Sequence, residues 1–313
     1  MSLASTIYGK AVHLRNSLYD RGRFRIHRLA KPVISVGNIS AGGAGKTPFV
    51  ILLGQMLKER GVSFDVLSRG YKRRTKGALE VNPHGSARDF GDEPLLIARR
   101  LGCPVIVGED RYEAGRFAET KFSAQAHILD DGFQHRRLAR DFDIVLLTPE
   151  DVCDQLLPAG RLREPISSLG RADAVVLTGE VDSSLLPPGK RVWRLRRTVS
   201  VPKAPDKPVV FCGIARPKQF ISQLEAAAVQ PVALKFYSDH YSYAGKDIQD
   251  LIALRDRNRG TGFITTAKDA INLGGLRERL GAVAIAEVKI EWPEAADALD
   301  TILRVISGSR PGP

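Results

Sequence analysis

The stretch PVISVGNISAGGAGKTP, Pro32 to Pro48, joins an apolar run to a helical pattern through a glycine-rich turn. Glycines in such a turn let backbone N–H groups point inward around a phosphate group, and the following helix N-terminus adds partial positive charge. The lysine after the turn reaches the β- and γ-phosphates, and the next hydroxyl can bind Mg²⁺. The strict P-loop pattern has glycine where this chain has Ser40. The turn predicts a P-loop whose candidate nucleotide-binding residues are Gly42, Gly43, Ala44, Gly45, Lys46 and Thr47.

Short β-branched runs alternate with helical patterns along the rest of the chain. The expected strands are 32–37, 63–68, 104–107, 127–130, 142–147, 173–177, 208–212, 231–236 and 262–265. Such alternation favours mostly parallel sheets with helices on both faces. We therefore predict an α/β protein of P-loop NTPase type with two α/β units, residues 1–200 and 201–313. The best linker candidate is 201–207 (VPKAPDK), which follows the extended stretch 191–200.

Composition and charge are those of a globular chain with basic character. Of 313 residues, 43% are hydrophobic and 26% are charged, which excludes disordered and collagen-like classes. The formal net charge of +12 makes polyanions or anionic surfaces the expected partners. No run reaches the roughly 18 to 20 apolar residues of a transmembrane helix, and no signal peptide is evident. Cys103, Cys153 and Cys212 are odd in number and far apart, which argues against a disulfide framework or a zinc site, so we expect a reducing cytosol.

Half of the net charge lies in the first 31 residues, which contain seven basic residues and a single acid, Asp20. In the same segment Ile7, Ala11, Leu14 and Leu18 recur at helical spacing and fall on one helix face. The pattern predicts a basic amphipathic helix. Two interpretations remain open: a helix that packs its apolar face on its own domain, or one that docks on an anionic membrane.

An apolar run that ends in acids, HILDDGFQH, starts at His127. A P-loop enzyme needs a carboxylate at a nearby strand end to hold the metal, and Asp130 or Asp131 supplies one. Adjacent strand residues point to opposite sides, so the two carboxylates need not share one role. Gln134 and His135 follow and are candidates to line the same site.

Two acidic motifs offer a group that could deprotonate a hydroxyl. Asp92 lies in GDEP at the start of a helical pattern, where an acid is also favoured by the helix dipole. His240 lies in DHY after an expected strand, at the strand end where α/β proteins place ligands. A structural and a catalytic interpretation both remain open for each. The loop LLPAGRLREP adds Arg161 and Arg163, whose guanidinium groups suit phosphate, and the acid Glu164.

Seven motifs in order resemble the tetraacyldisaccharide 4′-kinase family of lipid A biosynthesis: SVGNISAGGAGKTP, LSRGYKRR, GDEP, ILDDGFQH, LLPAGRLREP, FYSDHYSY and TTAKDA. The resemblance implies two Rossmann-like α/β/α units joined by a β linker, with the active site in the cleft between them. It implies an ATP- and Mg²⁺-dependent kinase for the 4′-hydroxyl of an acylated glucosamine disaccharide 1-phosphate, forming lipid IVA. It also places the enzyme at the cytoplasmic face of the bacterial inner membrane as a peripheral protein.

The resemblance implies roles for individual residues. The P-loop residues from Gly42 to Thr47 cradle ATP, with Lys46 also catalytic, and Asp92 with His240 forms the base and its partner. Thr47, Asp130, Asp131 and Gln134 organise Mg²⁺. The N-terminal basic helix then docks on the anionic membrane that holds the lipid substrate.

Three alternatives stand beside this interpretation. The first is a soluble P-loop kinase of a small hydroxylated metabolite. The second is a GTPase-like switch, disfavoured because Ala267-Lys268-Asp269 is not the guanine-reading Asn-Lys-x-Asp pattern. The third is a nucleic-acid-dependent ATPase, disfavoured because the chain has no recognised nucleic-acid motif. We therefore expect no nucleic-acid partner.

Overall fold

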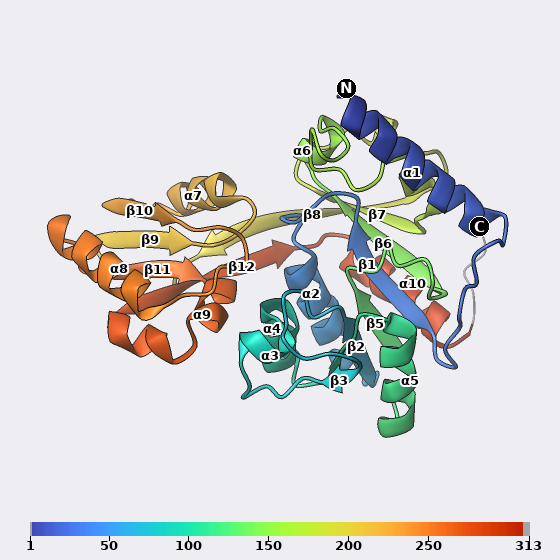
Figure 1. Ribbon diagram of the computed structural model, residues 1–313, viewed down its shortest axis with the longest axis horizontal. Coiled ribbons are helices and arrows are strands. Elements are labelled where there is room, and N and C mark those ends of the chain that lie inside the picture. The colour runs from blue at the N-terminus through green and yellow to red at the C-terminus, as the bar shows by residue number, and fades with distance from the viewer. Residues whose placement is uncertain (1, 309–313) are drawn as a thin grey trace.

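A computed structural model describes residues 2–308, and within them one twelve-stranded sheet runs in the order β10-β9-β11-β12-β8-β7-β6-β1-β5-β2-β4-β3 (Figure 1). The strands are β1 Val33–Asn38, β2 Phe64–Ser68, β3 Leu79–Glu80, β4 Val105–Val107, β5 Ala126–Asp130, β6 Phe142–Leu147, β7 Ala174–Thr178, β8 Arg191–Ser200, β9 Pro208–Cys212, β10 Ala233–Phe236, β11 Gly262–Thr266 and β12 Val283–Glu291. In the described part of the chain, β8 with β12 and β3 with β4 pair antiparallel and the other neighbours pair parallel. The predicted α/β class is confirmed.

Helices cover both faces of this sheet. They are α1 Leu3–Asp20, α2 Lys46–Glu59, α3 Ala87–Phe90, α4 Asp92–Leu101, α5 Arg111–Lys121, α6 Pro149–Val152, α7 Pro217–Ala226, α8 Gly245–Arg257, α9 Ala267–Leu273 and α10 Ala295–Ile306, with 3₁₀ turns η1 Ile166–Arg171, η2 Ser183–Leu185 and η3 Gly274–Leu280. α2, α4 and α10 pack on one face of the strands around β1, and α5 packs on the other. We call β1–β7 with their helices and α10 the first lobe, and β9–β11 with α7–α9 the second lobe.

β8 and β12 connect the two lobes in a continuous ladder. β8 pairs parallel with β7 and antiparallel with β12, which itself pairs with β11. Sequence patterns did not predict β12 as a strand and identified 191–200 only as extended. The physical reason is that both strands are only partly covered and carry several charged residues, so neither forms a buried apolar run along its length.

The last helix returns to the first lobe. α10 shares its core with α2, and the Trp292 ring just before it lies 5.1 Å from Phe49 and 5.6 Å from Trp193 between ring centroids. The predicted boundary after residue 200 coincides with the end of β8 at Ser200 and stays a prediction.

α1 turns a mixed face toward the protein, with Ser5 and Val12 as its buried residues. The Ser5 hydroxyl donates to the Leu156 carbonyl over 3.0 Å, the Tyr8 hydroxyl to the Arg163 carbonyl over 3.1 Å. Ile7 and Leu14, which the sequence placed on one apolar face, are 61% and 60% exposed. None of the helices within residues 2–308 is long and apolar enough to cross a membrane.

Candidate active site

A cavity of about 500 Å³ lies where the two lobes face each other. The first lobe contributes the P-loop, the end of β5 and the start of α4. The second lobe contributes the loop before α7, the loop after β10 and the start of α9, and β8 and β12 line the side between them. The cavity therefore collects residues from the carboxyl ends of strands in both lobes, where open α/β sheets bind ligands.

The P-loop has the backbone that its glycines allow. Gly42, Gly43 and Gly45 have φ angles of 73°, 75° and 85°, a region that side chains disfavour. Gly45 is the N-cap of α2 and makes no side-chain cap, so the first amides of this 14-residue helix are available to an anion. Lys46 is 9% exposed, and its Nζ lies 2.8 Å from Asn38 Oδ1 and 3.2 Å from Asp131 Oδ1.

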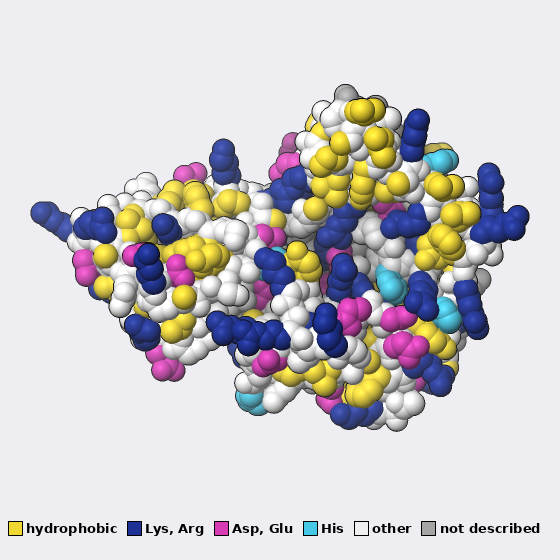
Figure 2. Space-filling view, viewed as in Figure 1, with side chains coloured by type: hydrophobic (Ala, Val, Ile, Leu, Met, Phe, Trp, Pro, Cys, Tyr) yellow, Lys and Arg dark blue, Asp and Glu magenta, His cyan; other side chains and the backbone are white. Residues whose placement is uncertain are grey.

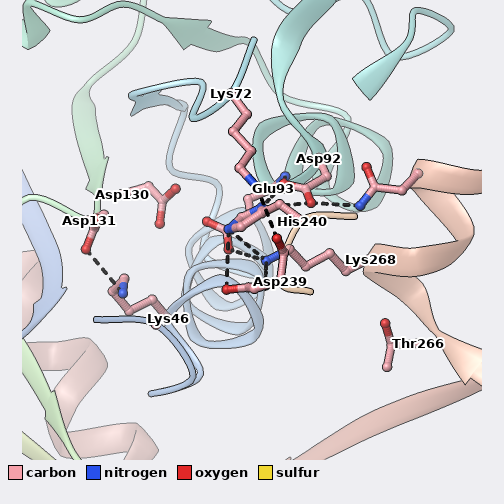
Figure 3. A network of polar contacts seen from close by, with 12 residues as sticks. Lys46, Lys72, Asp92, Glu93, Asp130, Asp131, Asp239, His240, Thr266 and Lys268 are labelled. Carbon is pink, nitrogen blue, oxygen red and sulfur yellow. Dashed lines mark hydrogen bonds and ion pairs between the residues drawn. The ribbon is translucent and has the colours of Figure 1, made fainter. Parts of the chain in front are cut away.

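Asp130 and Asp131 lie at the end of β5 and differ in their surroundings (Figure 3). Asp131 has φ of 52°, and it pairs with Lys46 and, over 2.9 Å, with Arg163. Burial raises the pKa of Asp131, but these two cations outweigh that effect and hold the pKa well below its usual range. Asp131 is therefore an anion in the free protein.

Asp130 instead accepts a 2.9 Å hydrogen bond from Ser68 Oγ, while its Oδ1 is buried without a hydrogen-bond partner. Burial, followed by the charges of Glu93 and Asp131, raises the pKa of Asp130 to about 7. An unpartnered buried carboxylate oxygen is costly unless something else supplies a positive group.

A magnesium ion that accompanies a nucleotide fits this arrangement. Within the described residues no cluster of three or more His, Cys, Asp or Glu could hold a metal alone. Mg²⁺ is usually held by one or two protein groups together with phosphate oxygens and water. Asp130 Oδ1 and the Thr47 hydroxyl, which both line the cavity, are suited to be those protein groups.

Asp92 and His240, 148 residues apart, meet across the cleft. His240 Nδ1 lies 2.9 Å from both carboxylate oxygens of Asp92, which also accept from Asn272 Nδ2 over 2.9 Å and from the Glu93 amide over 2.8 Å. Burial raises the pKa of Asp92, yet the His240 hydrogen bond, the Lys268 charge and the Asn272 hydrogen bond together bring it below its usual value. His240 has φ of 57°, an uncommon backbone for a non-glycine residue that is found at functional sites.

Lys268 completes this cluster and was missed by sequence reasoning, which considered it only as a failed guanine-reading motif. Its Nζ lies 3.1 Å from Glu93 Oε1, 3.2 Å from Asp239 Oδ1 and 3.2 Å from His240 Nε2 (Figure 3). Burial lowers the pKa of Lys268, but the charges of Glu93, Asp92 and Asp239 raise it overall. An ammonium group only donates hydrogen bonds, so Nε2 of His240 accepts and Nδ1 carries the proton that is donated to Asp92.

The other residues that the sequence singled out, Gln134, Arg161 and Glu164, make contacts within the first lobe around the P-loop. Gln134 is not among the residues that line the cavity; its Nε2 donates to the Asn38 carbonyl over 2.9 Å and to Glu164 over 3.1 Å. Arg161 donates to the Ala41 carbonyl of the P-loop over 2.7 Å. Glu164, which the sequence left without an assigned contact, is fully buried and pairs with Arg171 and Asn16.

Known proteins resemble the whole chain. The family model described as tetraacyldisaccharide-1-P 4′-kinase matches residues 1–307. The tetraacyldisaccharide 4′-kinase of Koribacter versatilis is 45% identical over 98% of both chains, and that of Aquifex aeolicus is 39% identical over 87% of this chain and 88% of its own. A crystal structure of LpxK from Aquifex aeolicus in complex with ATP superposes with a TM-score of 0.79 at 36% identity, covering 96% of this chain and 97% of the other. The nucleotide-binding turn, the cleft and these matches agree: the chain belongs to the tetraacyldisaccharide-1-phosphate 4′-kinase family.

Proposed function

We propose that this protein transfers the γ-phosphate of ATP to the 4′-hydroxyl of a tetraacyldisaccharide 1-phosphate, using the Asp92–His240 pair as base and partner. The supporting observation is that a P-loop and a buried, hydrogen-bonded carboxylate line the same cavity. The product of this reaction is lipid IVA, a lipid A precursor. The named relatives and the ATP-bound structure agree with this activity.

The phosphoryl donor site is formed by Gly42 to Thr47, whose amides and Lys46 surround the phosphates. In the free protein, Asn38 and Asp131 hold Lys46 Nζ. Lys46 must therefore leave Asp131 at least in part to reach the β- and γ-phosphates. When bound, Mg²⁺ would neutralise phosphate charge, and Thr47 and Asp130 would hold it. Asp131 pairs with Lys46, and Gln134 donates to the Asn38 carbonyl, so these two residues would organise the lysine and the turn around the ion.

The acceptor hydroxyl is oriented by Asp92, which is ionised and can accept its proton. Phosphoryl transfer passes through a loose transition state, so the base mainly orients the hydroxyl and takes the proton late. This suits a carboxylate with a lowered pKa. His240 fixes the direction of the carboxylate, and Lys268 fixes the tautomer of His240.

We further propose that α1 docks on the cytoplasmic face of the inner membrane, where a four-chain lipid substrate resides. Leu3, Ile7 and Leu14 are 78%, 61% and 60% exposed, and apolar side chains gather over this helix (Figure 2). Phe24 and Ile26, at 42% and 46% exposure, continue the same segment. An exposed apolar face beside lysines and arginines supplies both attractions of an interfacial helix. The alternative, a helix that packs this apolar face on its own domain, is disfavoured by the exposure of Ile7 and Leu14, while Ser5 and Val12 are the buried residues.

The transfer itself is tested with γ-labelled ATP and detergent-dispersed disaccharide 1-phosphate. Label should appear in the lipid with the wild-type chain and fall by orders of magnitude with Lys46→Ala. Asp92→Asn should lower kcat while ATP still binds. Equal labelling of a water-soluble, deacylated disaccharide would favour the small-metabolite kinase, and full transfer by Lys46→Ala would contradict the proposed donor site.

Docking is tested by flotation with vesicles that contain an anionic phospholipid. A variant with Leu3, Ile7 and Leu14 changed to Ser should remain in the dense fraction. The matched control changes Val232, Leu234 and Phe236 to Ser, exposed apolar residues on or directly before the edge strand β10, and should float like the wild type. Flotation of both variants would contradict the docking role of α1.

A further inference from the structure

Among the described residues, one half-buried guanidinium group in the active-site cavity, that of Arg197, has no hydrogen-bond or ion-pair partner; Arg69, which also lines the cavity unpaired, is exposed. Arg197 lies on β8, opposite Ile290 of β12, and lines the cavity from the strand that connects the two lobes. Its Nη1 lies so close to the P-loop that a Cβ atom added at Gly45 would collide with it. The side chain therefore lies against the turn that precedes Lys46.

Other arginines around the same turn are held by oxygen atoms. Arg161 donates to the carbonyls of Ala41 and Gly42, and Arg163 pairs with Asp131. Arg216, which packs against Gly43, donates to Thr148, Glu150 and Asp151 over 2.8 to 2.9 Å. Each of these guanidinium groups fixes the loop or joins the lobes.

Arg197 differs from them. Within residues 2–308 it makes no side-chain hydrogen bond and no ion pair. Two acids, Glu150 and Asp151, interact electrostatically with Arg197, but both already form ion pairs with Arg216. Burial and the neighbouring Arg216 charge lower the pKa of Arg197, which means that its surroundings disfavour the cation. A half-buried, unpaired cation with five N–H donors is costly unless an anion joins it during function.

We infer that Arg197 binds the phosphate chain of the nucleotide, so that the strand connecting the lobes contributes directly to the donor site. This inference rests on the proposed ATP site. Guanidinium groups form forked contacts with phosphate oxygens, and charge-assisted contacts of this kind are stronger than neutral ones. The position beside Gly45 places the donors at the mouth of the turn whose amides hold phosphate. The lipid acceptor also carries a phosphate group, its 1-phosphate. The experiment must therefore distinguish binding of the nucleotide phosphates from binding of the acceptor phosphate.

The test measures ATP, ADP and AMP binding by titration calorimetry on Arg197→Met and on Arg196→Met. Arg196 is the adjacent arginine of β8, exposed on the opposite side of the strand, and provides a matched control. We expect Arg197→Met to weaken ATP and ADP binding by about 10- to 100-fold, as for loss of a charged hydrogen-bonded contact. AMP, whose single phosphate does not extend into the turn, should lose less. Arg197→Lys should recover part of the loss, because a single ammonium keeps the charge without the fork.

Three outcomes separate the possibilities. If wild-type protein fails to bind ATP, the proposed donor site itself is wrong. If wild-type protein binds ATP and Arg197→Met binds it as tightly as Arg196→Met does, only the role of Arg197 is overturned. If Arg197→Met raises only the KM for the lipid acceptor, the guanidinium serves the acceptor phosphate and the nucleotide assignment is refuted. Equal melting temperatures of the two variants without nucleotide show that any loss is not unfolding.

Discussion

Removal of the Lys268 ammonium tests how the base is prepared. Lys268→Met keeps the length and apolar stem of the side chain but removes a cation that lies within 3.2 Å of His240 Nε2. Without it, Asp92 loses one of the charges that lower its pKa, and His240 loses the donor that selects its tautomer. Activity that requires ionised Asp92 falls as pH drops through the pKa of this group, so the acidic limb of the kcat/KM profile should move to higher pH.

The size of the effect follows from the contacts that are lost. The Glu93 and Asp239 side chains are 30% and 32% exposed, so water replaces much of what Lys268 gives them. The His240 side chain is 14% exposed, so its contact is screened less. One hydrogen bond to a charged group contributes about 1.5–3 kcal/mol, and we therefore expect kcat/KM to fall about 10- to 100-fold.

The assay is the pH dependence of initial rates with ATP and detergent-dispersed acceptor. Lys246→Met removes an exposed lysine of α8 and is the control for a lost positive charge in the same lobe. Lys268→Arg should recover part of the rate, since it keeps a cationic donor near Nε2. An unchanged rate with an unshifted acidic limb in Lys268→Met would refute the positioning role.

Two further predictions concern the cleft and the core. Gly45→Ala should strongly weaken ATP binding, because φ of 85° disfavours any side chain and the added Cβ atom would displace the Arg197 guanidinium group; ATP affinity equal to the wild type would contradict the loop geometry. Phe49→Ala should destabilise the protein by about 3–5 kcal/mol because a fully buried ring that contacts Trp292 is lost; urea unfolding checks this value, with the half-exposed Leu185→Ala as a near-neutral control.

The P-loop and the buried strands were predictable because their patterns are local. The glycines of the turn are required by their own φ angles. The strands β1, β5 and β6 are rich in apolar residues and buried along their whole length, because both of their faces are covered. β12 was not predicted as a strand because one part of it pairs with β11 in the second lobe and another part pairs with β8. As a result, neither of its faces is apolar throughout. Its strand identity depends on partners far away in the sequence.

Parts of the site were less visible for a related reason. Arg197 and Lys268 are common basic residues in stretches without glycine or paired acids, and only the fold brings them to the cleft. The pairing of Asp92 with His240 was given by a family resemblance, because nothing local in either motif points to the other. The sequence could not tell which side of α1 is buried, since the periodicity of Ile7, Ala11, Leu14 and Leu18 is the same for a buried face and for an exposed one.

Preparation of the base depends on both lobes. Asp92 belongs to the first lobe, while His240 and Asn272, which donate to it, belong to the second. Two further polar contacts cross the cleft, from Lys72 to the Asp239 carbonyl and from Lys268 to Glu93, and water can replace both. The strands β8 and β12, by contrast, connect the lobes through backbone hydrogen bonds. A carboxylate held by donors from the opposite lobe points correctly only when the lobes are together. Substitutions of His240 and Asn272 therefore act on the same carboxylate and share its Oδ2 atom, and their combined effect on kcat should be smaller than the sum of the separate losses in free energy.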